Sequence, residues 1–365
     1  MVLFKMSSDA SSEPTTTENP YAYTEYIPMT PWVQIPAAIC IACLIFMALA
    51  GNALTIISFI RDKRLRTVYD LYIFNLAITD MAVGCVSMPL YSTYTLREFI
   101  WTFGPGLCKG FLSIDFTACV ESTFMMIILS FDRLLLMTYG PHYHAKMTMK
   151  KAVITIVVSW ILAIIFYAPA ILFWDYWVGY STVPENDCGM EFAFNFEYTT
   201  TMAFLEFLIP VISLAVINFL IYKKIYNRLQ KNKIQPVSKN VATIEIKPNI
   251  ISVNEEPSNV PSTSNTAHAN DQKSGLSREQ TRTRRENKAA RFLAILVLVF
   301  LLTWMPYTLI TVITSFCAEA CINLSIYEAA NWLLWSKAAF NPVLYALNSE
   351  KYRSNFKKIV FFWKK

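Results

Sequence analysis

Seven ionisable side chains occur inside segments of the chain that are otherwise apolar. They are Asp80, Asp115, Glu121, Asp132, Arg133, Glu206 and Lys337. An ionisable group within hydrocarbon costs at least about 2.5 to 3.5 kcal/mol, so each of these residues is a candidate functional group. Most of them are carboxylates. An interior lined by carboxylates predicts binding of a cation, either by a receptor or by a cation-coupled transporter.

The apolar segments that contain these residues have the length of membrane-spanning helices. Of the 365 residues, 55% are hydrophobic and 16% are charged, and no charged residue lies between Glu25 and Arg61. A helix needs roughly 20 apolar residues to cross about 30 Å of hydrocarbon. We therefore predict an all-α membrane protein with a seven-transmembrane helix bundle over 33–347. Its helices are expected at about 33–60, 69–94, 106–138, 151–173, 198–230, 284–315 and 326–347.

The placement of Lys and Arg predicts how the bundle is oriented. Of 32 such residues, 28 lie within 61–66, 133–151, 223–291 and 351–365, which are alternate loops and the C-terminal end. The positive-inside rule then places the N-terminus outside and the C-terminus in the cytoplasm. The net charge of +6 thus reflects topology, and nucleic acid is excluded as a partner.

Three segments flank or interrupt the predicted helices. We expect 1–32 to be a disordered extracellular tail and 231–281 to be a disordered third cytoplasmic loop, because both are rich in polar residues. The last segment, 348–365, alternates basic and apolar residues. This pattern predicts an amphipathic cytoplasmic helix that lies against membrane lipid.

The eight cysteines fall into two groups. Four lie within the predicted spans and are expected to be small core residues: Cys40, Cys43, Cys85 and Cys119. The other four lie at outer ends or loops, where oxidation is permitted. Proximity favours a Cys317–Cys321 disulfide, which leaves Cys108 to pair with Cys188. Asn323-Leu324-Ser325 is an outer glycosylation sequon.

Catalytic patterns are not found in the sequence. It contains no nucleophile beside a base and no phosphate-binding loop, and its three His with scattered Cys leave too few spaced ligands for a zinc module. The chain is therefore predicted not to be an enzyme, and no metal or cofactor is expected. An internal repeat, which is usual in transporters, is also not found.

Short motifs, one in each predicted helix, are similar to those of a known family. In chain order they are Gly51-Asn52, Leu76-Ala77-Ile78-Thr79-Asp80, Asp132-Arg133-Leu134, Trp160, Pro210, Thr303-Trp304-Met305-Pro306 and Asn341-Pro342-Val343-Leu344-Tyr345. Over about 33–362 the chain resembles a rhodopsin-type G-protein-coupled receptor. The resemblance implies a receptor in the plasma membrane that activates a heterotrimeric G protein, with inhibitory coupling favoured, and that is bound by arrestin and receptor kinases.

The resemblance also implies a ligand site. Asp115 matches the carboxylate with which aminergic receptors bind the ligand ammonium, and Glu206, one turn before Pro210, resembles the acid of the third and fourth histamine receptor subtypes. Two anionic poles suit a small amine whose other end is an N–H heterocycle or a second cation. The remaining residues that the resemblance places in the site are Phe116, Cys119, Trp304, Tyr307, Trp332 and Trp335.

Several alternatives remain open. Asp115 could be a structural residue bonded to a neighbouring Tyr, and Glu206 could face lipid. Phe116 stands where the histamine subtypes have Tyr, and Leu134 where they have an aromatic residue. A muscarinic-like acetylcholine receptor is the main alternative, since an aromatic site also suits choline. A cation-coupled amine transporter is a further alternative.

Two internal arrangements follow from the resemblance and from helix spacing. Arg133 is expected to pair with Asp132 and with Glu286 in a closed state, whose opening would expose Asn218 and Tyr345 as well as Arg133 to the G protein.

The second arrangement concerns an ion site. In most members of the family that the chain resembles, a sodium ion is held by the aspartate that matches Asp80. A hydroxyl that matches Ser122 and polar groups of the seventh helix also bind this ion. Lys337 is one turn before Asn341, so we predict that it replaces the ion by pairing with Asp80; alternatively, it extends into a water-filled cavity.

Overall fold

The computed structural model describes residues 30–193, 195–238, 265–316 and 323–361, and in these ranges the regular secondary structure is entirely helical. The first span is α1 (Pro31–Arg61). The second consists of α2 (Val68–Ala82), a π-helical turn (Val83–Ser87) and α3 (Met88–Leu96). The third and fourth are α4 (Gly104–Tyr139) and α6 (Met149–Val178). The fifth consists of α7 (Phe196–Ala203), a π-helical turn (Phe204–Leu208) and α8 (Ile209–Ser238). The sixth and seventh are α9 (Asn265–Phe316) and α10 (Leu324–Asn348).

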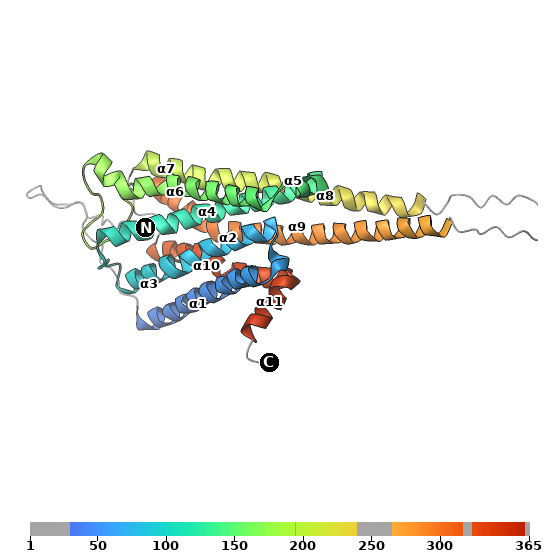
Figure 1. The fold of residues 1–365 in the computed structure, drawn as a ribbon. Helices are drawn as coiled ribbons and strands as arrows, with labels where there is room; N and C mark the ends of the chain where they lie inside the picture. Colours follow the sequence, from blue (N-terminus) through green and yellow to red (C-terminus); the bar gives the residue numbers. More distant parts are fainter. Residues whose placement is uncertain (1–29, 194, 239–264, 317–322, 362–365) are drawn as a thin grey trace, which may run out of the picture.

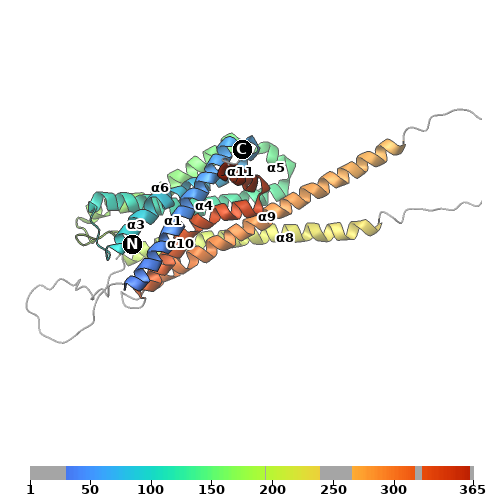
Figure 2. The ribbon, with the colours of Figure 1, turned by 90° about the horizontal axis from the view of Figure 1, so that it is seen from below.

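These helices form the expected seven-helix bundle, which Figures 1 and 2 show from two sides. Six of the spans in the described part of the chain are long and apolar enough to cross a membrane. The seventh, α10, packs against α1 and α9. Its buried face contains Asn331, Ser336, Lys337 and Asn341, and these polar residues lower its mean hydropathy.

Each of the two π-helical turns ends just before a proline. Pro89 follows Val83–Ser87, and Pro210 follows Phe204–Leu208. Proline has no backbone N–H, so it leaves the carbonyl four residues earlier without its helical partner. The helix can accommodate an extra residue at such a point, and π-helical turns of this kind are frequent at functional sites. The second turn contains Glu206.

Helix α1 is attached to α10 by a close backbone approach. A Cβ atom added to Gly51 would lie 2.8 Å from both Cβ and Cγ of Pro342, so only glycine fits here. The next residue, Asn52, is fully buried, and its Nδ2 donates to the carbonyl oxygen of Ala338 at 2.9 Å. These contacts fix the part of α10 around which the interior polar residues gather.

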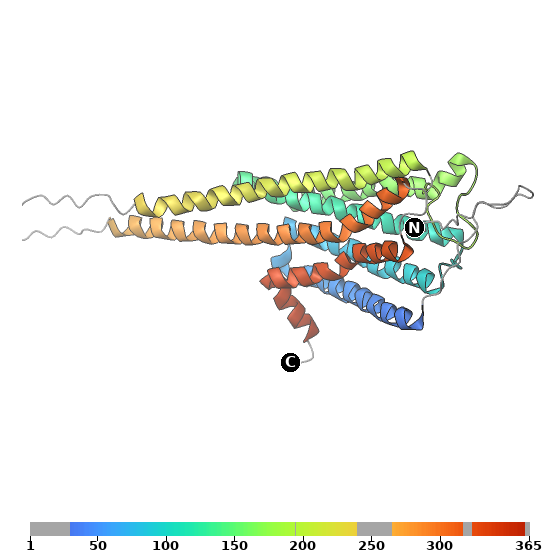
Figure 3. The same ribbon diagram turned by 180° about the vertical axis from the view of Figure 1, so that it is seen from behind.

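The two ends of the bundle differ. One end, called here the basic end, contains η1 (Lys63–Leu65), the short helix α5 (Pro141–Lys146) and α11 (Glu350–Val360). At this end α11 turns away from the axis of α10, as Figures 1 and 3 show. It presents Lys351, Arg353, Lys357 and Lys358 to the outside and packs Tyr352 and Asn355 inward. The expected C-terminal amphipathic helix is thus confirmed.

Asn355 and Lys351 attach α11 to the loop after α1. Nδ2 of Asn355 donates to Oδ2 of Asp62 at 2.8 Å, and Nζ of Lys351 donates to the carbonyl oxygen of Arg64 at 2.7 Å. Hydrogen bonds from the side chains of Arg64 and Asn355 hold the pKa of Asp62 well below its usual range. The carboxylate therefore remains charged at neutral pH, as this contact requires.

Two expectations about segments and cysteines need correction. Helices α8 and α9 extend beyond the other helices (Figure 3). Helix α8 ends at Ser238, and α9 begins at Asn265. The expected loop 231–281 is thus partly helical, and 239–264 lie outside the described residues, as do 1–29. Among the cysteines of the spans only Cys119 is buried, whereas Cys40, Cys43 and Cys85 are exposed on the outer surface of the bundle.

Candidate functional site

Asp115 lies inside the bundle on α4, two helical turns below Cys108. Its side chain is buried, and Nε1 of Trp335 on α10 donates to its Oδ1 at 3.1 Å. The rings of Tyr91 and Trp332 both pack edge to face against Trp335, at centroid distances of 5.0 and 5.3 Å. Among the described residues no Lys or Arg lies within 4.0 Å of Asp115. The carboxylate therefore lies beside a cluster of aromatic rings and has no Lys or Arg counter-ion among the described residues.

Glu206 is the second carboxylate of the site. It lies in the π-helical turn before Pro210 and accepts a hydrogen bond from the hydroxyl of Tyr167 on α6. The Tyr167 side chain is buried, and its ring lies 4.8 Å from that of Phe116. Phe116 directly follows Asp115 on α4. Contacts through Tyr167 and Phe116 thus lead from Glu206 to the residue next to Asp115, and the half-buried Glu206 has a hydrogen-bond partner inside the bundle.

The other predicted residues of the site come from the same region. Cys119 is buried one turn below Asp115. Trp304 is buried on α9, with its ring 4.7 Å from Phe300. Tyr307 lies one turn further along and packs against Tyr327 of α10 at 5.9 Å. Trp304 and Tyr307 thus lie on α9 and contact α10, the helix that also carries Trp335.

The predicted ion pair of Lys337 with Asp80 is not formed. Oδ2 of Asp80 instead accepts from Nδ2 of Asn341 at 2.7 Å, and Ser122 donates to the hydroxyl of Thr79 at 3.1 Å. The Lys337 ammonium lies over the rings of Trp304 and Phe300, 4.9 and 5.4 Å from their centroids. With 2% of the side chain exposed, it does not extend into a water-filled cavity either. Attraction to ring faces has replaced both expected environments.

The predicted pair of Arg133 with Asp132 is also not formed. The guanidinium carbon of Arg133 lies 3.6 Å from the centroid of the Tyr69 ring. Asp132 accepts from the hydroxyl of Tyr143 at 2.9 Å, and burial together with this acid raises the pKa of Tyr143. A planar guanidinium stacks well on an aromatic face, which explains the alternative contact.

The remaining residues at the basic end are placed as follows. Glu286 belongs to α9, but its side chain lies outside the described part of the structure. Asn218 donates to the carbonyl oxygen of Leu214 at 2.8 Å. Tyr345 is fully buried beside Phe292 and Tyr352, so it is inaccessible in this arrangement.

Glu121 belongs to a separate network. Asn75 of α2 and Ser159 of α6 donate to its Oε1 at 2.8 and 2.9 Å, and Trp160 donates to Asn75 at 2.9 Å. The carboxyl group is fully buried and connects three helices. Its contacts indicate a structural role at the helix crossing.

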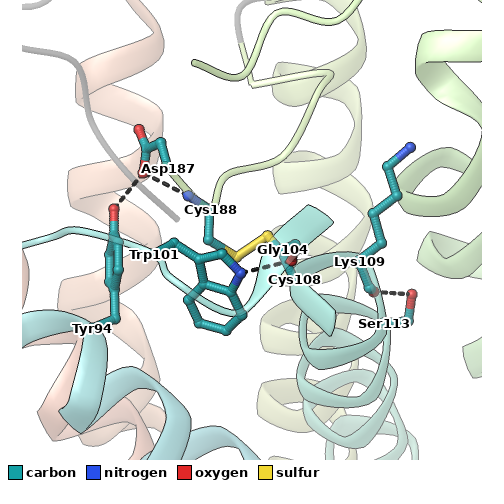
Figure 4. Close-up of a disulfide and its surroundings, with 8 residues drawn as sticks. All are labelled: Tyr94, Trp101, Gly104, Cys108, Lys109, Ser113, Asp187 and Cys188. Carbon is teal, nitrogen blue, oxygen red and sulfur yellow. Dashed lines mark hydrogen bonds between the residues drawn. A yellow bond between two sulfur atoms is a disulfide. The ribbon is translucent and has the colours of Figure 1, made fainter. Parts of the chain in front are cut away.

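The end opposite the basic end is held by a disulfide between Cys108 and Cys188, as expected. Figure 4 shows this bond with its neighbours. Asp187 accepts from the hydroxyl of Tyr94 at 2.5 Å and from the backbone N–H of Cys188 at 2.6 Å. Trp101 donates to the carbonyl oxygen of Gly104 at 2.8 Å. The segment after α6 is therefore anchored to both α3 and α4.

Two further predictions concern residues near this end. Cys317 and Cys321 lie outside the described residues. Asn323 forms the N-cap of α10, where its Oδ1 accepts from the backbone N–H of Ser325 at 2.8 Å.

Sequence reasoning missed Tyr167 and the pair formed by Tyr91 and Glu328, whose hydroxyl and carboxylate are hydrogen bonded. Tyr167 is seven residues, two helical turns, after Trp160, so both lie on the same helix face. That spacing could have indicated an inward position for Tyr167. The partner of Tyr91 lies on another helix, and no local spacing in the sequence indicates it.

Comparison with known proteins identifies the family. The family model described as "7 transmembrane receptor (rhodopsin family)" matches residues 51–345. The chain is 30% identical to the human (Homo sapiens) histamine H4 receptor, over 89% of this chain and 92% of that protein. It is also 30% identical to the mouse (Mus musculus) histamine H4 receptor and 25% identical to the chicken (Gallus gallus) muscarinic acetylcholine receptor M2, over 91% and 86% of this chain. These relatives are receptors and not enzymes. The chain is a multi-pass membrane protein that belongs to the rhodopsin family of seven-transmembrane receptors.

Proposed function

We propose that the protein is a plasma-membrane receptor for a small biogenic amine, most similar to histamine, and that ligand binding activates a heterotrimeric G protein of the inhibitory type. The observation that carries this proposal is the pair of carboxylates, Asp115 and Glu206, connected through Phe116 and Tyr167 inside the bundle. The similarity to histamine H4 receptors supports the same class of ligand.

Each carboxylate has a separate role in the proposal. Asp115 binds the ligand ammonium, which supplies the counter-ion that is missing among the described residues. The faces of Trp335 and Trp332 add attraction for the cation. Glu206 accepts from the other end of the ligand, an N–H heterocycle or a second cation. Tyr167 orients Glu206 by donating to one of its oxygens.

Ligand binding is proposed to act through a shift between two helix arrangements. An agonist that contacts Asp115, Glu206 and Tyr307 better in one arrangement favours it, by no more than its difference in affinity. Pro306 interrupts the hydrogen bonds of α9, so this helix can bend there. Opening at the basic end would expose Arg133, with Asn218 and Tyr345, to the G protein, and arrestin and receptor kinases would act at the same end.

The proposal extends to the orientation and the outer end. The N-terminus lies outside the cell, and the basic end lies in the cytoplasm, in accordance with the positive-inside rule. Cys317 and Cys321 form a second disulfide, and Asn323 carries a glycan.

A muscarinic-like acetylcholine receptor is the second candidate. The rings of Tyr91, Trp332 and Trp335 near Asp115 would suit a quaternary ammonium, and a muscarinic receptor is among the relatives. Acetylcholine has no N–H group, so it does not use Glu206 as an acceptor. The two candidates therefore differ in their dependence on Glu206.

A panel of biogenic amines tested on transfected cells for G-protein activation separates the candidates. Glu206→Ala should reduce the affinity for histamine-like ligands more than that for quaternary amines, and Glu185→Ala, at an exposed position, is the matched control. Equal losses, or none, would favour the muscarinic-like receptor. Accumulation of labelled amine in vesicles would instead indicate a transporter.

A further inference from the structure

The bundle interior contains two buried groups of opposite charge that each have an unsatisfied atom. Nζ of Lys337 and Oδ1 of Asp80 lack a hydrogen-bond partner among the described residues. Their side chains are 2% and 0% exposed. Burial of a charged group without an oppositely charged partner is unfavourable. The present arrangement thus leaves both groups incompletely compensated.

The two groups are within reach of each other without any change in the backbone of α10. Asn341 lies one turn after Lys337 on the same helix face and already donates to Oδ2 of Asp80 at 2.7 Å. Residues four apart on a helix have Cβ atoms about 5–6 Å apart. Rotation about the four-carbon stem of Lys337 can therefore place its ammonium beside Oδ1, the oxygen that Asn341 does not use.

Two rings of α9 hold the ammonium in its present position. Trp304 and Phe300 are one turn apart, and their centroids lie 4.9 and 5.4 Å from Nζ. Both residues precede Pro306, so they belong to the part of α9 that leads to the basic end. A bend at Pro306 that moves this part outward would carry both rings away from Lys337.

We propose that Lys337 is a charge switch with two positions. In the first, seen here, its ammonium lies against Trp304 and Phe300 and holds α9 to α10. In the second, formed when α9 moves outward, the ammonium pairs with Asp80. The ion pair then stabilises the open arrangement, and the ring contacts stabilise the closed one. This inference rests on the proposed opening of the bundle at the basic end but not on the identity of the ligand.

The switch differs from a fixed contact in the sign of two energetic couplings. Coupling of Lys337 to Asp80 should favour the open arrangement, whereas coupling to Phe300 should favour the closed one. If the contact of Lys337 with the two rings were fixed, the effect of substituting Asp80 would not depend on whether Lys337 is present. Double-mutant cycles measure these couplings directly.

The test measures helix positions in the full-length, ligand-free receptor in lipid nanodiscs. Spin labels are attached to unnatural residues that replace Tyr139 of α4 and Lys288 of α9, both of which are exposed. Pulsed electron resonance then gives the distance between the two labels. The measured ratio is that of molecules with a long distance, the open arrangement, to molecules with a short distance, the closed arrangement. Asp80→Asn should lower this ratio about tenfold, which is a usual size for coupling between sites. In the Lys337→Met background the same substitution should change the ratio less than about twofold.

A second cycle and a control complete the experiment. Phe300→Leu should raise the ratio about fivefold with Lys337 present and leave it unchanged in Lys337→Met. If Asp80→Asn does not fold, this second cycle alone tests the switch. Glu121→Gln, in the separate network, should respond equally in both backgrounds. Three outcomes would overturn the switch. They are equal effects of Asp80→Asn in the two backgrounds, a shift of Asp80→Asn toward long distances, and a single distance population in the receptor with Lys337 present. None of these outcomes bears on the amine proposal, which is tested by ligand binding.

Discussion

Asp115→Asn should stabilise the ligand-free receptor while it removes amine binding. The Asp115 carboxylate is buried, and its hydrogen bond from Trp335 is 3.1 Å long, which exceeds the roughly 2.7–2.9 Å of strong charge-assisted bonds. No described basic side chain lies within 4.0 Å. The Asn side chain has nearly the same shape, and its oxygen can still accept from Trp335, so that the substitution removes the charge and little else.

The magnitude follows from two opposing contributions. A buried charge without its partner costs about 3–5 kcal/mol, and a hydrogen bond to a charged group returns about 1.5–3 kcal/mol. The free energy of unfolding of the ligand-free receptor should thus rise by about 1–3 kcal/mol. Loss of one member of a buried charge pair costs about 2–5 kcal/mol in binding. The dissociation constant for an amine agonist should accordingly rise about 30-fold to 5,000-fold.

The assay compares the midpoint of thermal unfolding of purified receptor at one heating rate, followed by tryptophan fluorescence, with radioligand affinity. Asp70→Asn is the matched control, because Asp70 is also buried but accepts from the hydroxyl of Thr67 at 2.6 Å in the first turn of α2. A negative charge stabilises this end of a helix, so Asp70→Asn should lower the midpoint. An unchanged or lowered midpoint for Asp115→Asn, or undiminished affinity, would refute the reasoning and indicate a structural Asp115.

Two further predictions concern Lys337 and α11. The Lys337 ammonium disfavours a second cation near Asp80, so agonist affinity should hardly change when N-methylglucamine replaces sodium. In Lys337→Asn, by contrast, agonist affinity should become sensitive to sodium. A wild-type receptor whose agonist affinity depends strongly on sodium would contradict this prediction. Asn355→Ala should speed amide exchange in α11 about fivefold, the effect of about 1 kcal/mol, with Arg353→Ala, at an exposed position, as the control. The pKa of Asp62 is lowered, so the stabilisation that its carboxylate gives to α11 is present above the usual pKa of Asp and is lost as the pH falls toward the lowered value. Amide exchange in α11, corrected for the intrinsic exchange rate, should therefore not yet be faster at pH 6. Faster exchange at pH 6 would be inconsistent with this contact.

The spans could be predicted because a membrane-crossing helix depends on local length and composition. The observed ends differ where contacts between helices extend a span. Helix α6 was expected to end near 173 but continues to Val178, and within this last part Asp175 pairs with Lys109 of α4 at 2.7 Å. Polar residues near a span end are ambiguous in the sequence, because their partners lie elsewhere in the chain.

The candidate site was predictable in its residues but less so in its contacts. Residue type and helix position placed Asp115 and Glu206 inside the bundle. Lys337 was correctly placed on the inner face of α10 with Asn341, yet its side chain lies against α9 and not against α2. Helix periodicity determines the direction of a Cβ atom, whereas the end of a four-carbon side chain depends on which neighbouring helix offers the better contact.

The contact between Gly51 and Pro342 gives the seventh span a preferred direction of bending. Pro342 lies inside α10 and is a point at which that helix can bend, since it lacks the N–H of an ordinary residue. On the side of α1, however, its ring already lies so close to Gly51 that a single added carbon would be 2.8 Å away. A bend toward α1 would press the ring into the α1 backbone. The backbone at Gly51 thus limits how far α10 can bend at Pro342 in the direction of α1.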